Sequence, residues 1–219
     1  MREEIRREVD EFCSEFGYSL AKVEARIASI KEYEDKEYLS LIYFTLISFT
    51  QKRIKNILEI GTYRGSTTRM LSRLFPEALV NTIDLPAAII RKRIGLKYLR
   101  ARKSIEFKEN TGRDNVRFFD SDSFFLASLD LPREFDLIYV DGSHMFPAIA
   151  WDIAYSYAHL SSGGFMIVHD CHAGNDVKKA IAHMAKIVDG VRLLPFDYEN
   201  PEKKIAYVRK KEDIERRIE

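Results

Sequence analysis

The chain is poor in cysteine and has no long apolar run. Cys13 and Cys171 are its two cysteines in 219 residues, so there is no disulfide framework, and a reducing compartment is favoured. No apolar stretch approaches the roughly 20 residues that a membrane-spanning helix needs. The first residues mix both charges and lack the apolar core of a secretion signal. We therefore expect a cytoplasmic protein without a membrane partner.

An excess of charge of either sign is also missing. The formal net charge is +1, so global charge does not point to nucleic acid as a partner. Hydrophobic residues make up 46% of the chain, which is ample for a core. The length fits one α/β domain with an extension.

Apolar spacing predicts a helical part followed by alternating strands and helices. Apolar residues such as Ile5, Val9 and Phe12 recur at helical spacing within residues 2–53. Beyond residue 54, short apolar runs alternate with helical stretches, which predicts a parallel sheet covered by helices on both faces. The predicted strands are residues 57–60, 79–83, 116–119, 135–140, 165–168, 191–196 and 205–208.

The last two predicted strands are joined by residues 197–204, which is too short for a crossover helix. These strands should therefore be antiparallel neighbours. The expected fold is α/β: a seven-stranded, mostly parallel sheet with an antiparallel last strand, flanked by helices. We expect a helical N-terminal extension over residues 1–53, a ligand-binding domain over residues 54–210 and a charged tail over residues 211–219.

The first strand is followed by a turn with fewer glycines than a dinucleotide site needs. The turn has Gly61 and Gly65, which let a ligand approach the backbone, whereas a dinucleotide fingerprint has three glycines. Glu59, just before the turn, would repel a pyrophosphate. It suits a ligand with an ammonium group beside its carboxylate, such as an amino acid. The alternative is an ordinary strand-to-helix turn with Glu59 in a local salt bridge.

Acidic residues follow the next two strands, at the sheet edge where open α/β sheets bind ligands. Asp84 could accept hydrogen bonds from both hydroxyls of a ribose, or it could cap the next helix. Asp122, with Ser123, could hold an adenine amino group, and it could also cap the helix at residues 124–129. Together with the first turn, these positions indicate a ligand made of an amino acid, a ribose and an adenine.

With these residues in view, the chain resembles class I S-adenosylmethionine-dependent methyltransferases over about residues 54–209. The motif that carries the resemblance is Leu58-Glu59-Ile60-Gly61-x-Tyr63-x-Gly65-x-Thr67. It is similar to that of small-molecule O-methyltransferases of the catechol, caffeoyl-coenzyme A and antibiotic-sugar types. The resemblance implies a Rossmann-like fold, S-adenosyl-L-methionine as cofactor, and methyl transfer to an oxygen of a small molecule.

The same resemblance implies roles for the residues around the first three strand ends. Tyr63 and Thr67 would hold the carboxylate of the cofactor's methionine part. Asp84 would hold the ribose, and Asp122 with Ser123 the adenine. The helical residues 1–53 also fit, since proteins of this branch cover their site with N-terminal helices.

The fourth and fifth strand ends carry candidate metal ligands. In the resembling proteins, the acids that match Asp141 and Asp170 bind a divalent cation, and an asparagine follows the second acid. Cys171 stands at that position here and is a poor ligand for Mg²⁺. His144 and His169 offer nitrogen, which favours Mn²⁺, Fe²⁺ or Zn²⁺. Alternatively, Asp141 contacts the cofactor's ammonium group and Asp170 caps the next helix.

His144 is also a candidate base, because it lies where the resembling proteins have a catalytic lysine. A histidine with a pKa near neutral can take a hydroxyl proton as the oxygen attacks the methyl group. Asp141 and Asp170 would orient the acceptor hydroxyl. The alternatives for His144 are a metal ligand and a surface residue without a role.

Positive charge is concentrated in residues 91–108. The basic residues of this segment are Arg91, Lys92, Arg93, Lys97, Arg100, Arg102, Lys103 and Lys108. We favour a solvated helix face, which charge runs usually are, over a cap that attracts an anionic small-molecule acceptor. Nucleic acid is disfavoured because Tyr98 is the one aromatic residue interleaved with the bases up to Lys103.

Three other functions stay open beside O-methyl transfer. One is a hydroxylase-like relative on this fold whose His/Asp group binds iron. Another is an RNA methyltransferase that reads its substrate through residues 91–108. The third is a non-catalytic module that keeps only the cofactor pocket. The apolar faces within residues 5–49 could cover the core or form the interface of a homo-oligomer.

Overall fold

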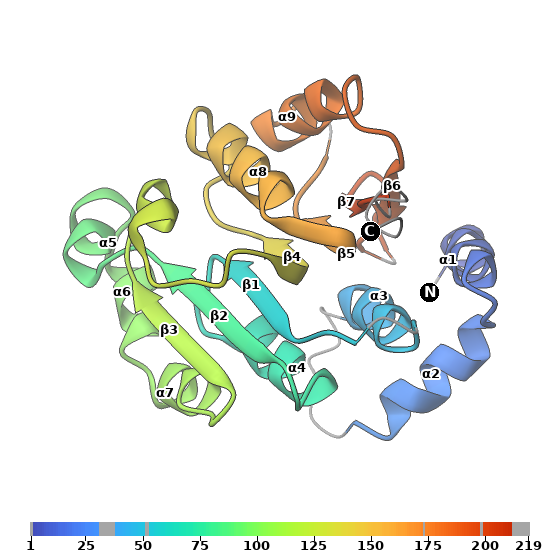
Figure 1. Ribbon diagram of the computed structural model, residues 1–219, viewed down its shortest axis with the longest axis horizontal. Helices are drawn as coiled ribbons and strands as arrows, with labels where there is room; N and C mark the ends of the chain where they lie inside the picture. The colour runs from blue at the N-terminus through green and yellow to red at the C-terminus, as the bar shows by residue number, and fades with distance from the viewer. Residues whose placement is uncertain (1, 31–37, 51–52, 173, 198, 212–219) are drawn as a thin grey trace, which may run out of the picture.

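The computed structural model describes residues 2–30, 38–50, 53–172, 174–197 and 199–211 (Figure 1). Its strands are β1 (Asn56–Ile60), β2 (Leu79–Asp84), β3 (Val116–Asp120), β4 (Phe135–Val140), β5 (Leu160–Val168), β6 (Val191–Pro195) and β7 (Lys204–Arg209). Its α-helices are α1 (Glu3–Glu15), α2 (Leu20–Ala28), α3 (Tyr38–Ser48), α4 (Ser66–Leu74), α5 (Ala87–Arg93), α6 (Leu96–Arg102), α7 (Ile105–Thr111), α8 (Ala148–Ala158) and α9 (Asp176–Met184). A 3₁₀ helix, η2, covers Ser123–Ser128.

Within the described residues, the strands form one seven-stranded sheet in the order β3-β2-β1-β4-β5-β7-β6. The pairs among β1 to β5 are parallel, and β7 runs antiparallel to both β5 and β6. The predicted fold class and the predicted antiparallel pairing of the last two strands are thus confirmed. The short link between β6 and β7 leaves a hairpin as the available connection.

Strand register brings the ends of the parallel strands to one edge of the sheet. Ile60 of β1 lies opposite Ile83 of β2 and Val140 of β4, and Val140 lies opposite Val168 of β5. The segments that follow these strands therefore meet at the same edge, on both sides of β1. This is where the strand order reverses and where open α/β sheets bind ligands.

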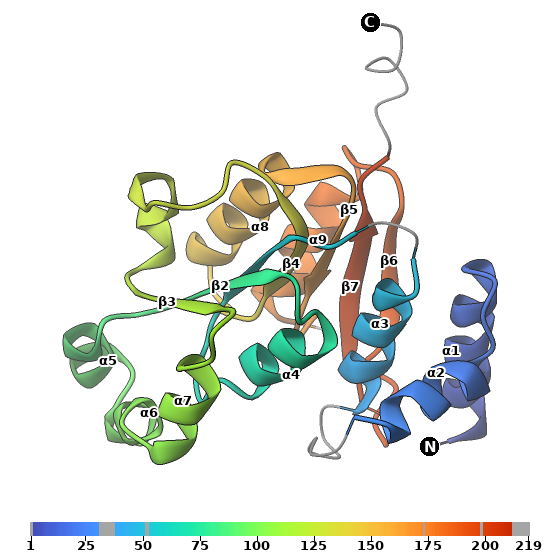
Figure 2. The same cartoon turned by 60° about the horizontal axis from the view of Figure 1, so that its bottom comes forward.

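The N-terminal helices pack against the sheet and share its core. α3 lies between the sheet and α2 in both views (Figures 1 and 2). The ring of Phe12 on α1 meets those of Tyr43 on α3 and Tyr207 on β7 at centroid distances of 5.8 and 5.0 Å. The Tyr43 hydroxyl donates to the carbonyl of Pro195 at 2.7 Å. Helices and sheet thus bury apolar groups in one cluster, while the division at residue 53 stays a prediction.

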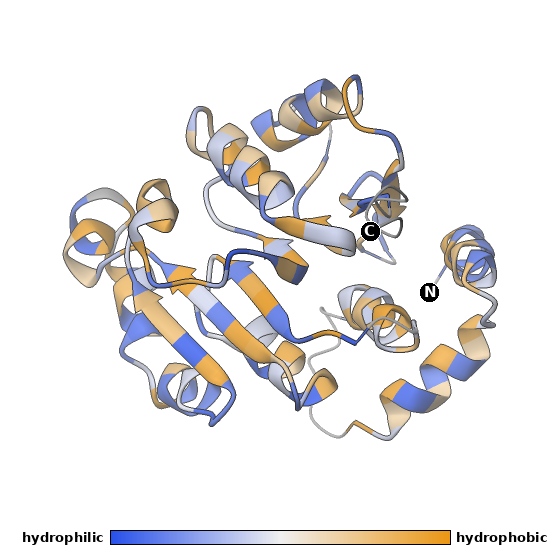
Figure 3. Ribbon diagram, viewed as in Figure 1, coloured by the Kyte–Doolittle hydropathy of each residue, from blue (hydrophilic) through white to orange (hydrophobic). Residues whose placement is uncertain are grey.

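Local apolar pattern explains most element positions. Figure 3 shows apolar residues along the strands and mixed hydropathy along α2. The fifth strand begins at Leu160 and not at residue 165. The polar, glycine-containing residues 161–164 belong to the strand and accommodate a register shift against β4. No helix of the described residues has the length and apolar character needed to cross a bilayer. The predicted tail beyond residue 211 lies outside the described residues.

Candidate functional site

The turn between β1 and α4 depends on glycine. Gly61 has a φ of +103°, and a Cβ atom there would lie 2.1 Å from the carbonyl oxygen of Asp141. Gly65 has a φ of +78° and stands at the N-cap of α4, where no side chain caps the first amides. Tyr63 between them also has a positive φ, +49°. The turn thus leaves amide groups at the start of α4 available beside the sheet edge.

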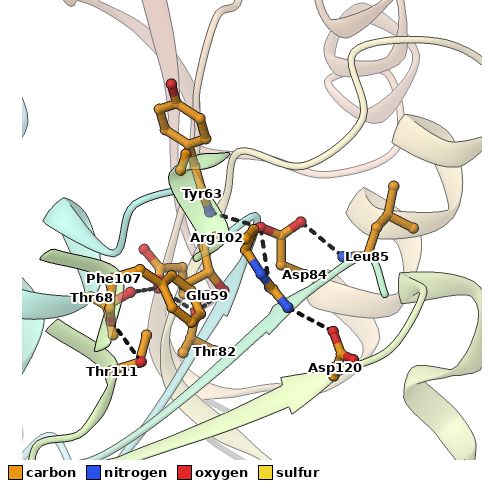
Figure 4. Close-up of polar contacts among 12 residues, drawn as sticks. Glu59, Tyr63, Thr68, Thr82, Asp84, Leu85, Arg102, Phe107, Thr111 and Asp120 are labelled. Atoms are coloured by element: carbon orange, nitrogen blue, oxygen red, sulfur yellow. Dashed lines mark hydrogen bonds and ion pairs between the residues drawn. The ribbon is translucent and has the colours of Figure 1, made fainter. Parts of the chain in front are cut away.

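Glu59 lies buried beneath this turn. Its Oε2 atom accepts hydrogen bonds from the hydroxyls of Thr68 and Thr82 at 2.5 Å each, as Figure 4 shows. Its Oε1 atom is buried and has no hydrogen-bond partner in the described structure. Burial raises the pKa of Glu59 to about 8, although the two hydroxyls oppose the rise. The alternative of a local salt bridge is not found among the described residues.

Asp84 at the end of β2 is tied to the same turn. It accepts hydrogen bonds from the backbone N–H of Tyr63 and of Leu85, each at 2.8 Å (Figure 4). Burial raises the pKa of Asp84, and Arg102 opposes the rise. The alternative role as a helix cap is wrong, since Pro86 holds the N-cap position of α5. Thr67, the other residue expected beside Tyr63, is half-buried in the first turn of α4.

Asp122 and Ser123 lie just beyond the end of β3. Asp122 caps η2 by accepting a hydrogen bond from the Phe124 N–H at 3.1 Å, which confirms the predicted capping role. The carbonyl of Ser123 accepts from the Trp151 indole at 2.9 Å. Asp122 and Ser123 thus follow β3, the edge strand that pairs with β2.

Three acidic or basic groups converge at the ends of β4 and β5. His144 Nε2 lies 3.4 Å from Asp141 Oδ1, and His144 Nδ1 lies 3.6 Å from Asp170 Oδ2. One ligand atom from each of these three residues falls within 4.8 Å of the others, a spacing that could hold a metal ion. His169, also expected as a ligand, stays outside this group. Its Nδ1 faces Asp141 and Asp170 at 3.2 and 3.5 Å, and its ring packs edge-on against Phe196.

The charges in this group stabilise one another. Burial opposes a charge on His169, but Asp141 and Asp170 raise its pKa to about 10. A hydrogen bond to Asp141 raises the pKa of His144. Burial would raise the pKa of Asp141, yet His169 and His144 together lower it, and the nearby His169 also lowers the pKa of Asp170. The two carboxylates are therefore held ionised.

Cys171 takes no part in this group. Its side chain is buried in the apolar core, and burial raises the pKa of the thiol to about 11. Asn175, four residues on, donates from its side chain to the carbonyl of Asp170 and caps α9 by accepting from the Lys178 N–H. The alternative in which Asp170 caps that helix is therefore wrong.

Sequence reasoning missed a buried arginine. Arg102 leaves 6% of its side chain exposed and lies against Asp84 and Asp120. For this residue, the expectation of a solvated helix face is wrong. Its described basic neighbours are exposed, as expected: Arg91, Lys92, Lys97, Arg100, Lys103 and Lys108. No spacing in the sequence distinguishes Arg102 from them.

Sequence reasoning also missed Asp152 on α8. Neither oxygen of its carboxyl group has a hydrogen-bond partner in the part of the chain that is described. Burial raises the pKa of Asp152 to about 6; the nearby Ser123 opposes this rise and Asp122 adds to it. A signal was present, because Asp152 is the one charged residue in the apolar helix Ala148–Ala158.

The sheet order and the edge built by these residues define a class I methyltransferase fold. A family model described as "Methyltransferase domain" matches residues 58–171, more than half of the chain. The chain therefore belongs to this methyltransferase family, which confirms the resemblance to class I S-adenosylmethionine-dependent enzymes. A search of curated proteins found no match.

Solved structures of methyltransferases share the fold at low sequence identity. The N-methyltransferase NodS from Bradyrhizobium japonicum WM9 is 17% identical, with 81% of this chain and 97% of that chain covered and a TM-score of 0.57. The O-methyltransferase TomG from Streptomyces achromogenes, solved with SAM, is 16% identical over 96% and 99% of the chains, with a TM-score of 0.56. An O-methyltransferase from Bacillus cereus, solved with SAH, is 17% identical over 96% and 100%, with a TM-score of 0.53.

Proposed function

We propose that this protein transfers a methyl group from S-adenosyl-L-methionine to an oxygen of a small molecule, assisted by a divalent cation. One observation carries the proposal. A glycine turn tied to Asp84 stands at the same sheet edge as the Asp141, His144 and Asp170 group. The first half suits the cofactor, and the second half suits an acceptor hydroxyl.

The residues of the first half fit the cofactor. The unpartnered Oε1 of Glu59 is an acceptor that the cofactor's ammonium group would satisfy. The uncapped amides at the start of α4, beside Tyr63 and Thr67, would bind the carboxylate. Asp84 would accept from the ribose, and Asp122 with Ser123 from the adenine. When bound, the cofactor supplies an electrophilic methyl group on a sulfonium, so the protein has mainly to align the reactants and exclude water.

The residues of the second half fit a divalent cation. Two carboxylates and one imidazole form a mixed oxygen and nitrogen donor set, which favours Mn²⁺, Fe²⁺ or Zn²⁺ over Mg²⁺. A cation there would polarise the acceptor oxygen and lower the pKa of its hydroxyl. Asp141 and Asp170 would hold this oxygen in line with the methyl group. His144 lies beside both acids and is more exposed than His169. It is our candidate for receiving the hydroxyl proton, a role that it would take where the two acids alone hold the cation.

The acceptor is proposed to be a small molecule, and an anionic one is favoured by charge. Exposed Lys and Arg side chains stand on α5, α6 and α7, the helices between β2 and β3. They would raise the local concentration of an acceptor that carries a carboxylate or a phosphate.

Calorimetry tests the cofactor half of the proposal. We expect S-adenosylmethionine and S-adenosylhomocysteine to bind and NAD not to bind. No binding of either S-adenosyl compound at millimolar concentration would defeat the proposal. Binding without transfer of a radiolabelled methyl group to any of a panel of phenols, carboxylates and sugar phosphates would favour the non-catalytic module. Label in RNA would favour the RNA methyltransferase.

Metal analysis tests the second half. Protein purified without chelator should carry a transition metal that is lost in Asp170→Asn and retained in Asp176→Asn, a half-buried acid at the start of α9 that lies outside the group. Full methyl transfer by a verified metal-free sample would contradict the proposed role of the metal. Addition of oxygen to the product, in place of a methyl group, would favour the iron-dependent hydroxylase. For the base role, an unchanged rate and pH profile in His144→Ala would rule it out.

A further inference from the structure

Arg102 is a buried cation at the ligand-binding edge with no role so far. Its guanidinium carbon lies 4.7 Å from the ring centre of Phe107 and 4.4 Å from that of Phe118. Its Nη2 atom donates to Asp120 Oδ1 at 2.6 Å, as Figure 4 shows. Two rings and one carboxylate thus hold the planar group in a single orientation.

The other end of this guanidinium is not satisfied. Nη1 is buried and has no hydrogen-bond partner among the described residues. It lies 3.6 Å from Asp84 Oδ2, which is an ion pair but too long for a hydrogen bond. Buried N–H groups normally have a partner, and a gap of this size invites an atom that bridges the two groups.

The chemistry of the two groups selects what can bridge them. A guanidinium only donates hydrogen bonds, and a carboxylate only accepts them. A hydroxyl does both, so it can donate to Asp84 and accept from Nη1 at the same time. A phosphate at this point would face the charges of Asp84 and Asp120, which disfavours it.

We propose that Arg102 is a second ribose-binding residue. One ribose hydroxyl of the cofactor accepts a hydrogen bond from its guanidinium group and donates one to Asp84. This inference rests on the proposed function, because it takes S-adenosylmethionine as the cofactor. The helix that carries Arg102 also touches the first turn. Tyr98, one helical turn earlier on α6, packs its ring 4.5 Å from that of Tyr63. α6 is therefore part of the cofactor site and not only a charged surface helix.

Calorimetry with S-adenosylhomocysteine and its 2′-deoxy and 3′-deoxy analogues tests the proposal. We expect Arg102→Met to weaken binding of S-adenosylhomocysteine about 10- to 100-fold, the effect of losing a charged hydrogen bond. For the analogue that lacks the bridging hydroxyl, the same substitution should have little effect. Arg102→Lys keeps the positive charge but not the planar guanidinium group, so we expect its affinity for S-adenosylhomocysteine to lie between those of Arg102→Met and the wild type. Arg100→Met, an exposed arginine on the same helix, should bind all three ligands like the wild type.

Several results would overturn the proposal. One is equal affinity of the wild type for all three ligands. Another is an equal loss for all three in Arg102→Met, which indicates a structural role. Arg102→Met could fail to fold, which circular dichroism would show. In that case Arg102→Lys is compared with the wild type on the same three ligands, and an equal loss of affinity for all three again contradicts the proposal. If the wild type binds no S-adenosylhomocysteine, the proposed function itself fails, which separates the two cases.

Discussion

The carboxyl group of Glu59 is buried beneath the first turn, and no cation pairs with it among the described residues. Its pKa of about 8 in the folded protein lies above the unfolded value of 4.5. The folded state therefore keeps a proton that the unfolded state has lost between these two pH values. By linkage, the contribution of this group to stability is fully present below pH 4.5 and is lost as the pH rises through about 8.

Glu59→Gln removes this titration and keeps a neutral side chain of the same size. We expect the difference in the free energy of unfolding, variant minus wild type, to increase as the pH rises from 4.5 to 8. The expected gain is on the order of a few kcal/mol. Urea unfolding without ligand at pH 5, 6.5 and 8 would measure it. Parallel stability curves for the two proteins would contradict the raised pKa.

Gly61 is the residue at which the backbone leaves least room. Gly61→Ala places a Cβ atom against the Asp141 carbonyl, so the cost combines a strained φ with an overlap. Gly17→Ala is the matched control, since Gly17 has a φ of +76° and nothing near its Cβ position. We expect a loss of roughly 1–2 kcal/mol in the control and a further 1–3 kcal/mol or more at Gly61. Equal losses in thermal unfolding would show that close contact is not what requires glycine.

At the scale of elements, α1 contributes to the core of the sheet through one face. Phe12→Ala should cost roughly 3–5 kcal/mol, because the ring contacts α3 and β7 in a fully buried position. Glu11→Ala on the exposed face should change stability by less than about 0.5 kcal/mol. Trp151 on α8, the one tryptophan, reports on the far side of the sheet. In urea unfolding of Phe12→Ala, the transition seen by Trp151 fluorescence should shift together with the transition seen by the circular dichroism of the helices.

The same experiment tests the predicted boundary at residue 53. If the helical signal is lost at lower urea than the Trp151 signal, residues 1–53 unfold as a separate unit. A single shifted transition would mean that helices and sheet form one cooperative domain.

Prediction from sequence succeeded best for the positions of helices and strands. The runs at residues 57–60 and 135–140 lie within or match β1 and β4, because buried parallel strands are apolar throughout. The start of β5 was missed because its first residues are polar and include Gly163. The orientation of Arg102 was missed because a short charged helix has the same composition whichever residue turns inward.

At the scale of the whole molecule, ligand binding should raise the melting temperature. At a concentration of S-adenosylhomocysteine 100 times its Kd, the folded state gains about 2.7 kcal/mol. For a chain of this length we expect a rise of roughly 5–11 °C. NAD at the same concentration should leave the melting temperature unchanged. A rise with NAD instead would point to a dinucleotide-binding protein.

The sequence by itself determined the class of fold and the side of the sheet on which the site lies. Apolar periodicity, turn glycines and the residue types after each strand are local properties, and local properties can be read along a chain. The tertiary structure alone decided which of these residues meet. It buried Cys171, brought His144 to two carboxylates and turned Arg102 toward Asp84. Among the described residues, it also left Glu59 and Asp152 without a paired cation. Those outcomes depend on contacts between segments far apart in sequence, which no local pattern contains.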